Sequence, residues 1–329
     1  MARARLHLNE NPFPPSPRVG MYLARYFYLF NRYDSKELTD RLYELLSNYV
    51  GFDREYIDVY PSSSAAITSI MFYARCKGAR FVTSRPGFFA LEEYARIAEI
   101  HVNYFELKPK SFEIDLEKLM RVVDSNTVLF IANPNNPTSN ILINDAKLVE
   151  ELCSIAHLVV LDEAYFEFSN VTFIDLVRKL PNLVIVRTLS KAFALAGARI
   201  GYIVAQPHLI KELSRYRIGY DVPLPSIVCA IAALEDLDYA RKTVETIKFL
   251  REKMRRELES MGLYVVPSAT NFLFVEVGDG TKVARELEAR GILVKFFDDP
   301  LTKEFIRVSV GREEENRKFI EALRKILGR

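Results

Sequence analysis

Polar and basic side chains stand beside several short apolar runs of this chain. In chain order they are Asn136 after 127–131, Asp162 and Tyr165 after 158–161, Ser190 and Lys191 after 183–186, and Arg199 just before 200–204. If the runs are strands of a parallel sheet, their ends share the edge at which open α/β sheets bind ligands. The spacing therefore predicts one crevice that gathers an amide, a carboxylate, a phenol, a lysine and an arginine.

Each of these groups also has a plain structural interpretation. The segment at 133–137 (Asn-Pro-Asn-Asn-Pro) is typical of a turn, Asp162 could cap a helix, and a loop lysine is usually solvated. Together, however, they suit a pyridine aldehyde phosphate. A lysine amine can form a Schiff base with the aldehyde, a carboxylate can keep the ring nitrogen protonated, and arginine with hydroxyls can hold the phosphate. Residues 62–66 (Ser-Ser-Ser-Ala-Ala) open a helix that could add backbone donors, although three serines also suit a simple N-cap.

The elements that must position these groups alternate along the chain. Strands are expected at 79–83, 127–131, 158–161, 183–186 and 200–204, with helices at 35–49, 91–98, 145–156 and 172–179. Wholly apolar strands separated by helices indicate a mostly parallel sheet with helices on both faces, the α/β class. A long charged helix at 238–261, ended by Gly262, begins a small α+β domain with strands at 272–277, 293–296 and 305–310 and helices at 281–290 and 314–327. We therefore expect an N-terminal arm at 1–31, a large domain at 32–235 and a small domain at 236–329.

Composition limits the kinds of partner. Of 329 residues, 49% are hydrophobic, and Lys+Arg 45 nearly balances Asp+Glu 43, so neither a nucleic-acid nor a membrane partner is expected. Cys76, Cys153 and Cys229 form no C-x-x-C pair, and the four histidines show no metal-ligand spacing, so no metal site is expected. No apolar run is long enough to span a bilayer and no signal peptide is evident, which favours the cytoplasm.

Longer segments carry a resemblance to a known family. The chain resembles the fold-type I pyridoxal-phosphate aminotransferases of class I/II over almost its whole length, and among them it is most similar to the histidinol-phosphate aminotransferases. The matching segments are 8–12 (Leu-Asn-Glu-Asn-Pro), 133–138, 161–165 (Leu-Asp-Glu-Ala-Tyr), 175–202 and 305–311 (Phe-Ile-Arg-Val-Ser-Val-Gly). The resemblance implies pyridoxal 5′-phosphate as cofactor, amino-acid and 2-oxo-acid substrates, and a homodimer.

The resemblance also implies roles for individual residues. Lys191 would be the Schiff-base lysine and proton carrier, and Asp162 would pair with the pyridine nitrogen. Asn136 and Tyr165 would bond the ring hydroxyl, and Phe88 would stack on the ring where the family usually has tyrosine. The phosphate would be held by Ser63, Ser64, Ser190, Arg199 and, from the neighbouring subunit, Tyr33. Arg307 would clamp the substrate carboxylate, and Lys295 would lie near the substrate side chain.

Three positions depart from the family pattern. Ser139 stands where the family usually has glycine, and the segment before the phosphate helix is all serine instead of carrying glycine and acidic residues. Both changes are expected to be tolerated if the local φ angles stay negative. Lys295 replaces an arginine, so any phosphate there would meet a point charge and not a planar fork.

Several functions fit this pattern. Transamination between histidinol phosphate and 2-oxoglutarate, as in histidine biosynthesis, is the first interpretation. An aromatic amino-acid aminotransferase and a threonine-phosphate decarboxylase of the same fold are the alternatives. A sensor that keeps the fold without turnover is disfavoured, because the chain has no spare segment for a DNA-binding domain.

Overall fold

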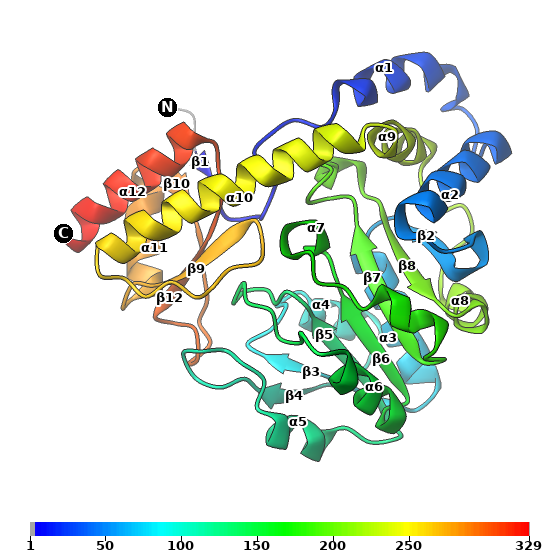
Figure 1. The fold of residues 1–329 in the computed structure, drawn as a ribbon, viewed down its shortest axis with the longest axis horizontal. Helices are drawn as coiled ribbons and strands as arrows, with labels where there is room; N and C mark the ends of the chain where they lie inside the picture. The colour runs from blue at the N-terminus through cyan, green and yellow to red at the C-terminus, as the bar shows by residue number, and fades with distance from the viewer. Residues whose placement is uncertain (1–3, 329) are drawn as a thin grey trace.

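The computed structural model describes residues 4–328 of the chain. Its centre is a seven-stranded sheet in the order β2-β8-β7-β6-β5-β3-β4 (Figure 1). The strands are β2 (Ile57–Tyr60), β3 (Arg80–Arg85), β4 (Val102–Glu106), β5 (Thr127–Ala132), β6 (Leu158–Asp162), β7 (Leu183–Thr188) and β8 (Gly201–Ala205). Only β8 runs antiparallel to its neighbours, β7 and β2. The prediction of a mostly parallel sheet is confirmed.

Helices cover both faces of this sheet, as predicted. Successive residues of a strand point to opposite faces, and along β5 Val128 and Phe130 join one apolar cluster while Leu129 and Ile131 join another. The first cluster lies under α3 (Ser63–Cys76), α4 (Leu91–Ile97) and α8 (Pro207–Leu213). The second lies under α2 (Lys36–Val50), α6 (Ala146–Ile155) and α9 (Leu224–Leu234). Among residues 4–328, no helix is both long and apolar enough to cross a membrane.

The C-terminal part is built around the long helix α10 (Leu237–Ser260), which Figure 1 shows reaching from the small domain to α9. A three-stranded antiparallel sheet follows in the order β11-β12-β9. Its elements are β9 (Phe272–Glu276), α11 (Gly280–Ala289), β10 (Ile292–Leu293), β11 (Lys295–Phe296), β12 (Phe305–Ser309) and α12 (Glu313–Leu327). The single strand expected at 293–296 is wrong: β10 pairs with β1 (Ala4–Arg5) and β11 with β12, so the chain changes sheets between them.

The N-terminal arm runs between these parts of the molecule. After β1 it is extended, then Ser16 caps α1 (Pro17–Tyr26) by accepting from the Arg18 amide, with proline at the first helical position. Helix α1 packs on α9. In Figure 1 this N-terminal segment (blue) runs from β1, beside β10, to α1, which lies next to α9.

A few local expectations fail for identifiable reasons. The α-helix expected at 172–179 is a short 3-10 helix, η3 (Ile174–Arg178), stopped before Pro181. Helix α9 is buried on almost all of its sides, so its apolar residues show no helical periodicity in the sequence. The remaining short elements are η1 (Phe27–Leu29), η2 (Arg54–Tyr56), α5 (Leu116–Val122), α7 (Phe166–Ser169), η4 (Ala196–Ala198) and η5 (Ser214–Tyr216).

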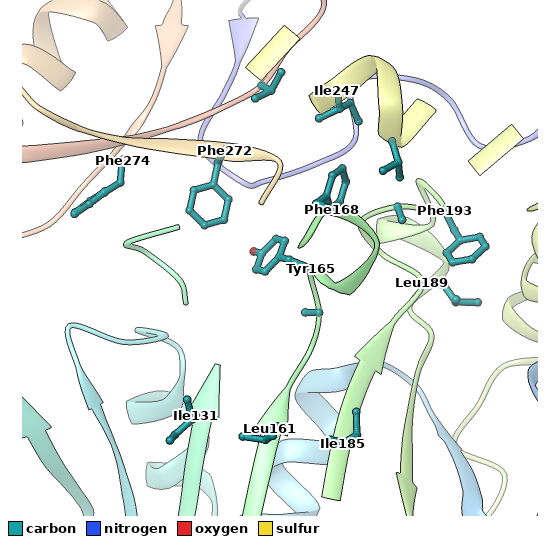
Figure 2. Close-up of a cluster of buried hydrophobic side chains, with 14 of the residues drawn as sticks. Ile131, Leu161, Tyr165, Phe168, Ile185, Leu189, Phe193, Ile247, Phe272 and Phe274 are labelled. Atoms are coloured by element: carbon teal, nitrogen blue, oxygen red, sulfur yellow. The ribbon is translucent and has the colours of Figure 1, made fainter. Parts of the chain in front are cut away.

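Where the two parts meet, a continuous apolar core fixes them against each other (Figure 2). The ring of Tyr165, from the end of β6, packs edge-on against Phe272 of β9 with centroids 5.3 Å apart. Ile247 of α10 and Phe168 of α7 lie close by in the same cluster. Tyr165 therefore belongs both to this core and to the sheet edge where ligands are expected.

Candidate active site

A cavity of about 400 Å³ opens at the carboxyl edge of the central sheet. It is lined by every predicted site residue except Tyr33 and Lys295, namely Ser63, Ser64, Phe88, Asn136, Asp162, Tyr165, Ser190, Lys191, Arg199 and Arg307. The antiparallel course of β8 explains the place of Arg199. It precedes that strand, and so lies at the same edge as the residues that follow β6 and β7.

Lys191 lies in the loop after β7 and reaches into this cavity. Its Nζ donates to the carbonyl of Asn9 over 3.1 Å. Burial, followed by the nearby Arg307 charge, lowers the pKa of Lys191 to about 8. The unprotonated amine, which a nucleophilic lysine requires, is therefore much more populated near neutral pH than it is for an exposed lysine.

Asp162 is the last residue of β6, and it is buried. Its Oδ1 accepts from the Ala164 amide over 3.1 Å, and burial raises its pKa to about 7. A buried carboxyl group of this kind becomes fully ionised when a cation is placed beside it, because an opposite charge favours the charged form.

Arg307 enters the cavity from β12 as a buried cation. Its Nη1 donates to Asn136 Oδ1 over 2.6 Å and its Nη2 to the His7 carbonyl over 2.7 Å. Its Nε is buried and has no acceptor among residues 4–328. Burial lowers the pKa of Arg307 to about 10, and no carboxylate in the described part of the chain offsets that cost. A buried guanidinium held by neutral groups is suited to bind an anion.

The N-terminus of α3 is a second position in the cavity that is suited to bind an anion. Ser62 is its N-cap and accepts from the Ala65 amide over 3.2 Å, which confirms the capping interpretation of one serine. The first-turn amides of a helix have no intrahelical acceptor, so those of Ser63 and Ser64 are free for a ligand. Gly201 permits this placement, since a Cβ on it would lie 2.4 Å from the Ser63 nitrogen.

The condition under which the departing serines were expected to be tolerated, negative φ angles, is not met at two positions. Ser62 has φ 129° and ψ 159°, and Ser139 has φ 68°. Both values belong to regions that favour glycine, since a Cβ there is crowded by the backbone. The Ser139 hydroxyl is also buried without a partner in the part of the chain that is described. The two serines are therefore held in strained conformations by their surroundings.

A second cavity, of about 330 Å³, adjoins the first and shares Phe88 and Phe89 with it. Lys295 lines this second cavity, with its Nζ 4.9 Å from the Phe89 centroid. Lys295 is also directly opposite Arg307 in the β11–β12 register, and such pairs share one face of a sheet. The Phe297 ring lies 5.9 Å from both cations.

Tyr33 lies outside both cavities of its own chain. It is 85% exposed, and its ring packs against Tyr220 with centroids 6.0 Å apart. Its expected role toward a neighbouring subunit stays a prediction.

Sequence reasoning left Asn9 and Glu10 without roles, although both line the active-site cavity. Asn9 is buried, donates to the Tyr165 hydroxyl over 3.0 Å and presents its carbonyl to Lys191. The signal was present in residues 8–12, whose polar composition is unusual for a frayed terminus. Thr188 and Gly197 were also missed.

Behind the site, a buried ion pair joins the residue that follows β6 to strand β7. Glu163 and Arg187 are 1% and 3% exposed, and Arg187 Nη2 lies 2.8 Å from Glu163 Oε2. Thr172 and the Phe173 amide also donate to Glu163. Each charge is therefore compensated by its partner and by further hydrogen bonds, which holds the ends of β6 and β7 together.

Comparison with known proteins identifies relatives of this chain. Residues 8–323 match the family described as Aminotransferase class I and II. A histidinol-phosphate aminotransferase of Sulfurisphaera tokodaii is 34% identical over 328 residues, covering 98% of this chain and 89% of that protein.

Solved structures agree with that match. The histidinol-phosphate aminotransferase of Sinorhizobium meliloti in complex with pyridoxal-5′-phosphate superposes with a TM-score of 0.89 at 27% identity, covering 99% of this chain and 91% of that one. An L-threonine-O-3-phosphate decarboxylase of Porphyromonas gingivalis superposes with a TM-score of 0.84 at 22% identity, covering 99% and 100%, and is alike in fold alone.

Proposed function

This chain belongs to the class I and II aminotransferases, and on that premise we propose that it exchanges an amino group between histidinol phosphate and 2-oxoglutarate. It is a pyridoxal-phosphate-dependent aminotransferase. The substrate pair and the roles of individual residues are the proposal.

The observation that carries the substrate proposal is the pair of cations Arg307 and Lys295 on one face of the small sheet. Like charges directly opposite each other across two strands destabilise a sheet. Neither makes an ion pair with a carboxylate among the described residues. A phosphate dianion between them would offset both charges, which favours a phosphorylated substrate.

The chemistry of the two substrates fits the same position. In histidinol phosphate the Cα carries a CH2–O–phosphate group in the position where an amino acid carries its carboxylate. Arg307 would therefore receive the α-carboxylate of glutamate in one half-reaction and the phosphate in the other. Lys295 adds the second positive charge that a dianion needs, acting as a point charge.

The donor set around the cavity fits pyridoxal 5′-phosphate. Asp162 would hold a protonated ring nitrogen, Tyr165 and Asn136 would bond the ring hydroxyl, and Phe88 would stack on the ring. The phosphate contacts would be Ser63, Ser64, Ser190 and Arg199, with Tyr33 from a partner chain. When bound, the cofactor supplies a ring that withdraws electrons from the substrate Cα.

The protein's own residues would then do three things. Lys191 would hold the cofactor in the resting enzyme, and its amine, once released, would accept the proton of the substrate Cα. Arg307 would orient the substrate so that this proton faces the amine. The arm would cover the cavity through Asn9, which contacts both Tyr165 and Lys191. Because one amino group is stored between two half-reactions, the kinetics would be ping-pong.

A second candidate is an aromatic amino-acid aminotransferase. The rings of Phe88 and Phe89 meet edge to face with centroids 5.7 Å apart at the boundary of the two cavities. They would pack equally well on an imidazole or on a phenyl side chain.

The deciding experiment is a panel of half-reactions. Histidinol phosphate, phenylalanine, tyrosine and threonine phosphate are each mixed with the holoenzyme, and the visible absorbance band is followed. Histidinol phosphate is expected to bleach the band at the lowest concentration. If only the unphosphorylated aromatic amino acids bleach it, the substrate proposal is wrong, and carbon dioxide release from threonine phosphate would indicate the decarboxylase.

Lys295→Met sharpens this test. Loss of a charge-assisted contact of about 1.5–3 kcal/mol should raise the KM for histidinol phosphate roughly 10-fold or more and leave that for phenylalanine nearly unchanged. Lys303→Met, at an exposed lysine near the same sheet, is the matched control. Lys191→Ala should abolish turnover while the protein still folds.

Assembly and location form part of the same proposal. Exposed aromatic side chains of the arm, Phe27, Tyr28 and Phe30 with Tyr33, form an apolar surface suited to a second copy of the chain. Sedimentation should find a dimer, and a monomeric holoenzyme would contradict this. The unpaired Cys76, Cys153 and Cys229 suit the reducing cytoplasm, which cell fractionation can check.

A further inference from the structure

We propose that Tyr94 is a positioning residue for the cofactor phosphate and that it acts through Ser64. Tyr94 lies on α4, and its hydroxyl donates to Ser64 Oγ over 2.7 Å. Ser64 lies in the first turn of α3 and lines the active-site cavity. Tyr94 does not line that cavity, so any effect on the ligand would pass through its neighbours.

The direction of this hydrogen bond gives it a consequence. A serine hydroxyl has one hydrogen to donate and two lone pairs that accept. Because the Tyr94 hydrogen occupies a lone pair of Ser64, the hydrogen of Ser64 is free to point at an anion in the cavity. Hydroxyl groups linked in this way polarise one another, which strengthens the final bond.

Packing holds the tyrosine in place. Its ring meets Phe88 at 69°, with centroids 6.1 Å apart, and joins the apolar cluster beneath α3 and α4. Tyr94 therefore contacts both the proposed stacking ring and a proposed phosphate ligand. Ser190, another proposed phosphate ligand, has a similar partner, since Thr188 Oγ1 donates to Ser190 Oγ over 2.9 Å.

The inference rests on the proposed placement of the cofactor phosphate, and the experiment tests the two separately. The dissociation constants of pyridoxal 5′-phosphate and of pyridoxal, which lacks the phosphate, are measured on apoenzyme by absorbance titration. Tyr94→Phe should weaken pyridoxal phosphate about fivefold, the equivalent of one hydrogen bond of about 1 kcal/mol. Its affinity for pyridoxal and its apoenzyme melting temperature should not change, because the ring and its packing remain.

A double-mutant cycle identifies the route. Tyr94→Phe combined with Ser64→Ala should bind pyridoxal phosphate no more weakly than Ser64→Ala alone, because both changes break one relay. Tyr264→Phe, which removes a hydroxyl that donates to the Lys110 carbonyl away from the cavity, is the control.

Three results would overturn the inference. Equal weakening of pyridoxal phosphate and pyridoxal would place the effect in the stacking of Phe88. Additive losses in the cycle would show that Tyr94 acts independently of Ser64. If Ser64→Ala alone leaves the affinity for pyridoxal phosphate unchanged, the proposed position of the phosphate beside Ser64 is wrong. The proposed role of Tyr94 is then wrong as well.

Discussion

Replacing Ser62 by glycine should stabilise the apoprotein relative to replacing it by alanine. Ser62 has φ 129° and ψ 159°, a region occupied almost only by glycine, and a side chain there costs about 1–3 kcal/mol. The same residue caps α3 through its Oγ, 3.2 Å from the Ala65 amide. The two effects oppose each other, and the two substitutions separate them.

The magnitudes follow from these contacts. Ser62→Gly removes the strain, which stabilises the folded state. It loses only a few tenths of a kcal/mol of capping, and it raises the entropy of the unfolded chain, which destabilises the protein by about 0.4–1 kcal/mol. The net change is a stabilisation on the order of 1 kcal/mol. Ser62→Ala loses about 1 kcal/mol of capping and keeps the strain. The free energy of unfolding of the glycine variant should therefore lie about 2 kcal/mol above that of the alanine variant.

The assay is urea unfolding of apoprotein followed by circular dichroism, at one protein concentration because assembly shifts apparent stability. Ser63→Gly is the matched control. Ser63 is the first helical residue of α3, so glycine there relieves no strain and should destabilise by about 0.5–1 kcal/mol. An alanine variant at position 62 as stable as the glycine variant would refute the argument from strain.

Three further changes test other parts of the site. Ser139→Gly should stabilise the protein by about 1–2 kcal/mol in urea unfolding, since it relieves a left-handed conformation and removes a buried hydroxyl without a described partner; no gain would contradict this. Gly201→Ala should weaken pyridoxal phosphate binding more than 10-fold and destabilise the fold by about 1–3 kcal/mol, because its Cβ would meet the Ser63 backbone; wild-type affinity would contradict this. Burial raises the pKa of Asp162 to about 7, so its contribution to apoprotein stability is present below pH 4 and is lost as the pH rises through 7. Asp162→Asn should therefore match wild type in acid and be more stable than wild type at pH 8, by roughly 1–4 kcal/mol, and a pH-independent difference would count against this.

Most of the fold could be predicted because the strands are uniformly apolar and short. Runs such as Val159 and Val160 in β6 can only be buried on both faces, which requires helices above and below. The direction of β8 could not be predicted, because an apolar run has the same composition whichever way it is traversed. Strand β4 was missed because it lies at an edge of the sheet and only Val102 and Phe105 of its residues are buried, so its sequence shows neither an apolar run nor a strict alternation.

Some residues of the site could also be predicted from the sequence, and others could not. Asn136, Asp162 and Lys191 follow from their order after successive strands, a local property of the sequence. Arg199 precedes β8, so its place at the same edge depends on the antiparallel direction of that strand. Arg307 comes from a different sheet, and its approach to Asn136 spans 171 residues, so only the family resemblance pointed to it. The strain at Ser62 also escaped prediction, since the identity of a residue does not reveal its φ angle.

The positive charges around the cavity would favour an anion at each of two places. At one end lie the N-terminus of α3 and Arg199, which favour an anion through helix dipole and cationic charge. At the other end lies Arg307, and Lys295, which lines the adjoining cavity, is directly opposite it in the β11–β12 register. Lys191 lies in the wall of the cavity that joins the two ends, with its pKa lowered to about 8 by burial and by Arg307. A substrate anion that neutralises Arg307 would remove part of that effect and raise the pKa of the lysine, so binding of the correct substrate would itself favour the protonated amine. Substrate charge would thus be coupled to the step in which Lys191 accepts and returns a proton.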